Sequence, residues 1–285
     1  METFDIQSDK LDLKIAIVEV ESIHMHEETI LELVQKLAAD LLKDGIMRHP
    51  IIVDQETIVV LDGMHRAAAS RMIGCVRIPV CFVDYENLWI RVESWYRTFS
   101  KAAGQDLINE LIRWNIKTRR SSIEEARKNL EKGTAAAFIA TNRECLIIRN
   151  TRNDVLQNFR LVASIERMAK GLGYLIGYET EKDALNQLEA ELTSAILGPP
   201  PITKVDVRRS GLRNDLLPHK STRHIIPARP LGINVPIEIL QDRRMGLQQA
   251  NKQLIEMLTR RPVKRLDPGS LIENRRYEEQ IFLFT

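Results

Sequence analysis

Apolar and polar residues follow two different periods along the first hundred residues. A helical spacing of apolar side chains runs over 27–45 and ends at Gly45. Runs rich in β-branched residues predict strands at 14–23, 49–55, 57–62, 77–85 and 90–97. A second helix is predicted after Gly63, where an alanine-rich stretch follows the strand 57–62. These patterns therefore predict that residues 12–97 form one compact α/β unit.

The middle of the chain carries a second set of strand and helix patterns. A capping box, Ser122 to Glu125, predicts the start of a helix. A hairpin is predicted over 134–140 and 145–150. Further patterns predict a helix over 153–170, a strand over 174–179 and a helix over 183–197 that ends at the GPPP segment. We therefore expect a second α/β subdomain and an α/β (α+β) fold class.

The last third of the chain changes in character. Four prolines, two histidines and several basic residues predict loops and short strands over 216–236. A charged helical tail follows, and it ends in the strand-like IFLFT. The predicted organisation is a domain over 1–97, a second subdomain over 98–242 and a helical tail over 243–285.

Composition narrows the class of protein. Of 285 residues, 44% are apolar and 28% are charged, which is typical of a globular protein with a sizeable core. The formal net charge of +2 argues against wholesale nucleic-acid binding. The three cysteines have no pairing pattern and are expected to be buried free thiols. Neither a leader segment nor an apolar run of about 20 residues is recognisable, so we expect a cytoplasmic protein with no membrane contact.

Residues 61–74, LDGMHRAAASRMIG, contain the strongest candidate site. A strand that ends at Gly63 and continues into a helix exposes backbone N–H groups to an anion, and His65 and Arg66 add donors suited to phosphate oxygens. Asp62 is suited to a divalent cation beside such phosphates. The alternative interpretation is that Asp62 caps the helix and Arg66 is a solvated surface charge. The chain has no Walker A motif, so a nucleotide would be held in another way.

The segment from HPIIV to the strand RIPVCFVDY resembles the ParB/sulfiredoxin-like fold. That fold contains a hairpin, a Gly-x-His/Arg-Arg turn, a helix ending in Ile-Gly and an IPV strand. A sulfiredoxin needs a reactive cysteine immediately before His-Arg, and this chain has Met64 there, which argues against redox chemistry. A chromosome-partition ParB protein should carry a helix-turn-helix next, whereas 98–180 shows hairpin and strand–helix patterns.

The remaining branch of that fold is the free L-serine kinases. HEET (26–29), ESWYR (93–97) and NLEKGTAAAFIA (129–140) resemble segments of that family, as does HKSTRHIIPARPLGINVPIEIL (219–240). The tail NRRYEEQIFLFT resembles the ParB-like serine kinase of staphyloferrin B siderophore clusters, which is the branch that these motifs favour over the archaeal ADP-dependent serine kinase. The resemblance covers about residues 12–285.

The resemblance implies a kinase that makes O-phospho-L-serine in a cleft between the two α/β parts. Glu27 is then the general base, a role that typically contributes about 10²–10⁴-fold to the rate. Its other interpretation is a carboxylate that favours the helix dipole. Asp62 holds Mg²⁺, and the nucleotide phosphates contact Gly63, Met64, His65 and Arg66. The residues implied for serine are Trp95, Lys220, Thr222, Arg223 and His224. The phosphate donor is ADP or ATP.

A regulator is the alternative from another class of protein. It would be a ParB-like protein that binds DNA or a small effector and controls a biosynthetic operon. Its DNA contacts would come from Arg208, Arg209, Arg213 and the basic segment 243–265. Such residues more often form solvated helical faces. The two functions are compatible, so DNA is a secondary candidate partner beside serine and the nucleotide. The sequence leaves open whether the product feeds siderophore precursors or cysteine biosynthesis, and it does not predict the oligomeric state.

Overall fold

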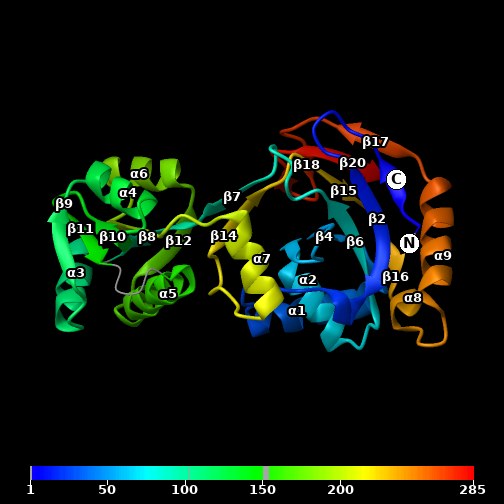
Figure 1. Ribbon diagram of the computed structural model, residues 1–285, viewed down its shortest axis with the longest axis horizontal. Helices are drawn as coiled ribbons and strands as arrows, with labels where there is room; N and C mark the ends of the chain where they lie inside the picture. Colours follow the sequence, from blue (N-terminus) through cyan, green and yellow to red (C-terminus); the bar gives the residue numbers. More distant parts are fainter. Residues whose placement is uncertain (1, 102, 150–153) are drawn as a thin grey trace. The chain divides into compact units, whose positions relative to one another are not determined.

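The computed structural model describes residues 2–101, 103–149 and 154–285 of the chain (Figure 1). Contacts divide the chain into two compact units. The first unit comprises 1–91, 207–215 and 224–285, and the second comprises 92–206 and 216–223. This division differs from the predicted one, because the first unit ends at 91 instead of 97. The C-terminal tail also folds with the first unit, where Asn251 forms a hydrogen bond with Ile17, 234 residues away along the chain.

The first unit is built on a five-stranded mixed sheet. Its strand order is β1 (Phe4–Ile6), β2 (Leu13–Glu19), β6 (Arg77–Val83), β4 (Ile51–Asp54) and β5 (Val60–Asp62). β4 and β6 are parallel, and the other neighbours are antiparallel. Helices α1 (Leu31–Asp44) and α2 (Met64–Met72) pack against each other. The predicted hairpin, second helix and IPV strand are thereby confirmed.

Helix α1 ends as predicted but begins later. Gly45 has a φ of 67°, and its N–H donates to the Leu41 carbonyl at 3.0 Å. The helix begins at Leu31, whereas the apolar pattern predicted a start near 27. Glu27 therefore lies in an extended segment four residues before the helix, and it does not belong to the first helical turn.

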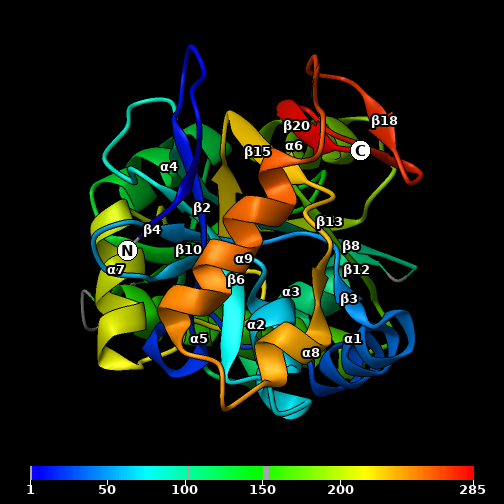
Figure 2. The same cartoon turned by 90° about the vertical axis from the view of Figure 1, so that its right-hand side faces the viewer.

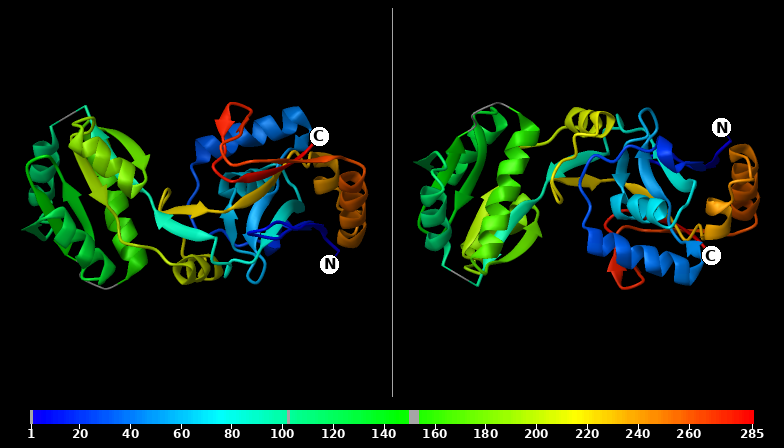
Figure 3. Two further views of the ribbon diagram at one scale, coloured as in Figure 1. Left: turned by 90° about the horizontal axis from the view of Figure 1, so that it is seen from above. Right: turned by 90° about the horizontal axis from the view of Figure 1, so that it is seen from below.

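The C-terminal part of the first unit adds two helices and a small sheet. These elements are α8 (Ile237–Gln241), α9 (Leu247–Thr259), β15 (Ala228–Leu231), β17 (Val263–Leu266) and β20 (Gln280–Phe284). Figure 2 and Figure 3 show α9 beside the N-terminal strands. The Asn251 amide accepts from the Ile17 N–H and donates to the Ile17 carbonyl, both at 2.8 Å. Because β1 pairs with β2 only over Leu13–Ile15, Asn251 satisfies backbone groups that β1 leaves unpaired.

The second unit is a six-stranded antiparallel sheet between helices. The strand order is β12 (Leu175–Glu179), β8 (Tyr96–Ser100), β13 (Ala195–Gly198), β10 (Ala135–Ala140), β11 (Cys145–Arg149) and β9 (Thr118–Ser121). Helices α3 (Gly104–Arg113) and α5 (Val155–Gly171) cover one face, and α4 (Ile123–Glu131) and α6 (Glu181–Glu189) cover the other. Alternate residues of β10 face the two cores, as the period of a strand requires.

The helix predicted over 183–197 in the second unit is wrong in its second half. The pattern over 183–197 predicted one helix, but α6 ends at Glu189 and the last residues form β13. Glu191 has a φ of 55°, which interrupts the helix, and β13 then pairs with both β8 and β10. Its apolar residues are buried because the strand is central in the sheet, and a short apolar run does not distinguish that environment from a helix. The predicted capping box is confirmed, because the Ser122 hydroxyl accepts from the Glu125 N–H at the start of α4.

The remaining elements join or flank the two units. Strand β7 (Arg91–Ser94) pairs with β14 (Thr222–Ile225), and the division into units falls within both strands. The predicted strand 90–97 is thus two strands, β7 and β8, which are separated at Trp95. The short elements are η1 (Val20–Ser22), β3 (Ile46–Met47), α7 (Lys204–Arg213), β16 (Val235–Pro236), β18 (Leu271–Ile272) and β19 (Arg275–Arg276).

Candidate active site

The predicted strand–glycine–helix turn is present in the first unit. Strand β5 ends at Asp62, Gly63 is the N-cap residue, and α2 starts at Met64. Gly63 has a φ of 101°, a backbone conformation that L side chains rarely adopt. A Cβ atom at this position would lie 2.7 Å from Cγ2 of Ile51. The turn therefore requires glycine for its conformation and for the close approach of β4.

Asp62 lies between two arginines. Its Oδ2 atom accepts from Arg66 at 3.1 Å and from Arg229 at 2.8 Å. Burial alone would raise the pKa of this carboxyl, but Arg229, Arg66 and Arg275 together lower it from 3.8 to about 2. Asp62 is thus a carboxylate at neutral pH. The alternative interpretation of Asp62 as a helix cap is wrong, because Gly63 occupies the cap position.

Arg66 is held from several sides within the first unit. Its guanidinium donates to the carbonyls of His49 at 3.2 Å and Pro50 at 2.5 Å, in addition to Asp62. Its side chain is 22% exposed. Arg66 is therefore not a solvated surface charge, and it fixes the β3–β4 connection against the start of α2. Its predicted contact with a phosphate stays a prediction.

Arg229 is a site residue that sequence reasoning missed. It is buried in β15, where it forms ion pairs with Asp62 and with Glu279. Its guanidinium lies 5.9 Å from the centre of the Tyr277 ring. No local pattern marks Arg229, because its partners are separated from it by 167 and 50 residues along the chain.

The donors around Asp62 do not fit a resident magnesium site. Across 2–101, 103–149 and 154–285, no three His, Cys, Asp or Glu side chains are grouped so that they could hold a metal ion. Asp62 is the acid predicted to bind Mg²⁺, and its Oδ2 atom is already taken by two guanidinium groups. Mg²⁺ commonly reaches a kinase on the phosphates of its nucleotide with only one or two protein carboxylates.

Glu27 belongs to an extended segment that is fixed close to the turn. Its side chain is buried, with only 8% of the residue exposed. On one side, the His26 carbonyl accepts from the Ser210 hydroxyl at 2.9 Å. On the other side, the Ile30 N–H donates to Nε2 of His65 at 3.2 Å. His65 in the first turn of α2 therefore holds the segment that carries Glu27, and its Nε2 atom acts as an acceptor.

His224 lies with Tyr85 and His26 in the first unit. The Tyr85 hydroxyl is 2.7 Å from Nε2 of His224, and the rings of His26 and His224 meet edge to face at 5.4 Å. Trp95, Lys220, Thr222 and Arg223 belong instead to the second unit. The predicted serine-binding set is therefore divided, with His224 in one unit and the other four residues in the other.

His26 gives the first unit a pH-dependent stability. Burial lowers the pKa of its imidazole from 6.5 to about 4, although the Val60 carbonyl at 2.7 Å opposes the shift. The His26 imidazole binds a proton near pH 6.5 in the unfolded chain but only near pH 4 in the folded chain. The folded state therefore keeps its full stability above pH 6.5 and loses stability as the pH falls from 6.5 to 4. The loss amounts to about 3 kcal/mol.

We expect His26→Asn to weaken that pH dependence. Asparagine keeps a donor for the Val60 carbonyl and removes the titrating ring. Urea unfolding at pH 7.5 and 4.5 measures the difference in unfolding free energy for the wild type, for His26→Asn and for His24→Asn, whose ring is only partly buried. Equal pH dependence in all three proteins would show that His26 is not its source.

The second unit contains a cluster of cations and aromatic rings. Nζ of Lys220 lies 5.0 Å from the centre of the Trp95 ring and 5.9 Å from that of Tyr178. The Arg223 guanidinium lies 5.5 Å from the Trp95 ring and forms an ion pair with Glu93 at 3.0 Å. Lys220 has a φ of 61°, which costs free energy for a residue with a side chain. Lys220 and Arg223 thus place two cations against the ring of Trp95.

A buried ion pair holds two aromatic residues of this cluster in position. Arg97 is fully buried, pairs with Glu166 at 3.2 Å and donates to the Trp95 carbonyl at 2.7 Å. The Tyr178 hydroxyl donates to the same Glu166 carboxylate at 2.5 Å. Trp95 and Tyr178 are therefore fixed through one carboxylate. Arg97 is only two residues from Trp95, yet no pattern in the sequence indicates that its side chain is buried.

The neighbouring residues 221 and 222 differ in their surroundings. The Ser221 hydroxyl is buried and donates to the Pro218 carbonyl at 2.6 Å. Thr222 is half-buried and begins β14.

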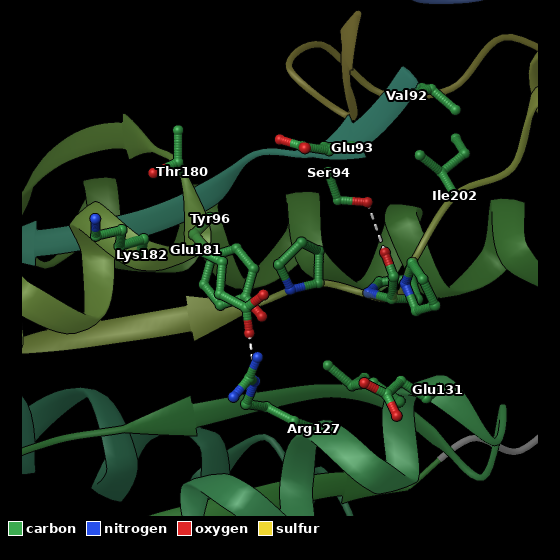
Figure 4. Close-up of a pocket in the computed structure, with 14 residues that line it drawn as sticks. Val92, Glu93, Ser94, Tyr96, Arg127, Glu131, Thr180, Glu181, Lys182 and Ile202 are labelled. Carbon is green, nitrogen blue, oxygen red and sulfur yellow. Dashed lines mark hydrogen bonds and ion pairs between the residues drawn. The ribbon is translucent and has the colours of Figure 1, made fainter. Parts of the chain in front are cut away.

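A pocket of about 430 Å³ lies elsewhere in the second unit (Figure 4). The Ser94 hydroxyl donates to the Pro200 carbonyl at 2.7 Å, and Arg127 pairs with Glu181 at 2.5 Å on its wall. The pocket is lined by β7 and β8 residues, by α4 and α6 residues and by the prolines 199–201. None of the residues predicted for the active site is in its wall, and it shares only Glu93 with the Trp95 cluster.

Comparison with known proteins identifies relatives of this chain and the fold that it shares with them. No protein-family model matches the chain. The chain is 28% identical over 237 residues to the ATP-dependent L-serine kinase of Staphylothermus marinus, which covers 79% of this chain and 90% of that protein. A free serine kinase solved as a glutamate-to-glutamine variant with AMP has a TM-score of 0.70 at 21% identity, and the match covers 83% of this chain and 97% of that one. The chain has the fold of the free serine kinases.

This match confirms the predicted resemblance and fold class. The resemblance to the staphylococcal branch is weaker over the whole length than its C-terminal motifs indicated. The ATP-dependent L-serine kinase SbnI of Staphylococcus aureus is 20% identical over 230 residues, which cover 79% of this chain and 83% of that protein. Within the part of the chain that the structure describes, no helix is long and apolar enough to span a bilayer.

Proposed function

We propose that the protein is a free L-serine kinase that uses ADP or ATP to make O-phospho-L-serine. The observation that carries the proposal is the hydrogen bond between His65 and the Ile30 N–H, which joins the segment of Glu27 to the start of α2. A carboxylate and an anion-binding turn are thereby fixed in one unit. Relatives of the chain bear the names ATP-dependent and ADP-dependent L-serine kinase, which supports an adenine nucleotide as the phosphate donor.

In the proposed reaction, the serine hydroxyl oxygen attacks the terminal phosphorus of the nucleotide. Glu27 accepts the hydroxyl proton as the new O–P bond forms. The bond from that phosphorus to the bridging oxygen breaks, and AMP leaves if the donor is ADP, or ADP if it is ATP. Phosphoryl transfer requires mainly positioning and charge neutralisation. Backbone N–H groups at Gly63 and Met64, with His65 and Arg66, are assigned to the phosphates.

The Trp95 cluster is assigned to free serine. The amino acid carries a carboxylate, and Lys220 and Arg223 offer two cations whose charges are concentrated beside one ring. Thr222 adds a hydroxyl at the start of β14. His224 is assigned to the serine hydroxyl. The hydrogen bond between the Tyr85 hydroxyl and Nε2 of His224 would hold the imidazole in position.

The test is a phosphorus NMR assay with L-serine, Mg²⁺ and one nucleotide at a time. We expect O-phosphoserine to accumulate in equal amount to AMP from ADP or to ADP from ATP, which also identifies the donor. D-Serine and a reaction without amino acid are the controls. Nucleotide hydrolysis that is independent of serine, or no product with either nucleotide, would contradict the proposal.

One of the arginines that suggested a DNA-binding regulator is paired with acidic residues in the structure. Arg208 forms ion pairs with Asp54, Glu56 and Glu86, so its charge is neutralised within the first unit. A DNA-binding role would then depend on other basic residues, such as Arg213. The pathway that uses the product stays a prediction, with siderophore precursors and cysteine as its two candidates.

A further inference from the structure

The C-terminal tail forms a hairpin whose position in the first unit is well defined by contacts. Strands β18 and β19 are joined by a two-residue turn, Glu273–Asn274, with φ values of 47° and 64°. The hairpin closes at its base, where the Tyr277 N–H donates to the Ser270 carbonyl at 3.0 Å and its carbonyl accepts from Gly269 at 2.7 Å. Tyr277 is buried, with 6% of the residue exposed. The hairpin is therefore fixed to the unit by a buried aromatic ring.

Tyr277 connects the hairpin to the turn that carries Asp62. The Arg275 guanidinium lies 4.7 Å from the centre of the Tyr277 ring, and the Arg229 guanidinium lies 5.9 Å from it. Arg229 is in turn bound to Asp62 at 2.8 Å. Arg275 is also one of the charges that lower the pKa of Asp62. Residues near the end of the chain thus reach the same turn that Gly63 and Arg66 form.

The arginines at this turn differ in what they bind. Arg66 and Arg229 form ion pairs with Asp62, and Arg229 also pairs with Glu279. Glu273, in the hairpin turn, lies 3.9 Å from His49. The Arg275 side chain is exposed and has no hydrogen bond or ion pair to any residue that the structure describes, and its contact is the face of the Tyr277 ring. It is a cation that is positioned by stacking and has all five N–H donors available.

We propose that Arg275 binds the terminal phosphate of the nucleotide, so that the C-terminal hairpin is part of the donor site. A guanidinium is suited to this contact because its parallel donors match two phosphate oxygens. Stacking on Tyr277 orders the side chain before the nucleotide arrives, which reduces the entropy lost on binding. This inference rests on the proposed function, since it assumes that the turn at Gly63 holds a nucleotide.

Binding of AMP, ADP and ATP to Arg275→Gln, measured by isothermal titration calorimetry, tests the proposal. Loss of a charge-assisted phosphate contact should weaken ADP and ATP by about 10-fold. AMP lacks the terminal phosphate and should bind within about 2-fold of its wild-type affinity. Arg276→Gln is the matched control, because it removes the same charge from the next residue of the same exposed hairpin. It should leave all three affinities within about 2-fold.

The outcomes separate this inference from the proposed function. Formation of O-phosphoserine together with unchanged ADP and ATP affinity in Arg275→Gln would overturn the role of Arg275 and leave the kinase intact. A selective loss of ADP and ATP affinity in a protein that makes no O-phosphoserine would support Arg275 and contradict the kinase. Equal losses in the Arg275 and Arg276 variants would show a general effect of charge and would overturn the inference. A wild type that binds none of the nucleotides overturns both.

Discussion

Replacement of Glu27 by glutamine is expected to lower the turnover of L-serine phosphorylation by at least about 100-fold. Glutamine keeps the size of the side chain but cannot accept the hydroxyl proton, so the step most affected is chemistry. The segment that carries Glu27 is held by the carbonyl of His26 and the N–H of Ile30, and these backbone contacts are independent of the Glu27 carboxylate. Nucleotide affinity should therefore stay within about 2-fold of the wild type.

Glu28→Gln is the matched control for this variant. Glu28 is the next residue of the same segment, carries the same charge and is exposed, whereas Glu27 is buried. Single-turnover measurements at saturating nucleotide compare the chemical step of the two variants directly. If Glu27→Gln keeps most of the wild-type rate, or if both variants slow equally, the general base has been assigned to the wrong residue.

The local features of the site could be predicted because they depend on neighbours in the sequence. Gly63 follows a β-branched run and precedes an alanine-rich helix, so the turn between them is determined within about ten residues. Gly45 ends α1 for a similar reason. The position of Glu27 was predicted less well, because an amphipathic pattern identifies a helix better than it identifies the first residue of that helix.

The long-range contacts of the site could not be predicted from the same patterns. Arg229 meets Asp62 and Tyr277 meets Arg229 only after the C-terminal part of the chain has folded onto the first unit. The sequence separated that tail into its own region because it is charged and follows a proline-rich stretch. In the second unit, Arg97 and Glu166 are 69 residues apart, and neither has a local signal for burial.

These contacts also change the interpretation of the predicted turn. Asp62 and Arg66 were assigned to a metal and a phosphate because of their residue types. In the structure, both side chains belong to an ion-pair network that orders the turn, and Arg229 is its third member. Residues that shape an anion site and residues that touch the anion have the same chemistry, so a motif alone does not separate them. Arg275 lies outside the motif and has its donors available.

Gly63→Ala is expected to lower the free energy of unfolding of the protein strongly. The left-handed backbone of Gly63 costs a residue with a Cβ atom about 1–2 kcal/mol. The new Cβ would also lie 2.7 Å from Cγ2 of Ile51, a fully buried β-branched side chain that has little room to move. Overpacking of this kind adds about 1–3 kcal/mol. We therefore expect a loss of about 2–5 kcal/mol in the free energy of unfolding, together with weaker nucleotide binding.

Gly74→Ala separates the two causes. Gly74 follows the same helix with a φ of 77°, but a Cβ atom there would meet no other atom within 4 Å. This variant should lose only about 1–2 kcal/mol in the free energy of unfolding, which is the cost of the left-handed backbone for a residue with a Cβ atom. It should keep the nucleotide affinity of the wild type. Urea unfolding and nucleotide titration of both variants measure the difference. Equal stability losses in the two variants would mean that contact with Ile51 does not restrict the turn, and that Gly63 is required for its backbone conformation alone.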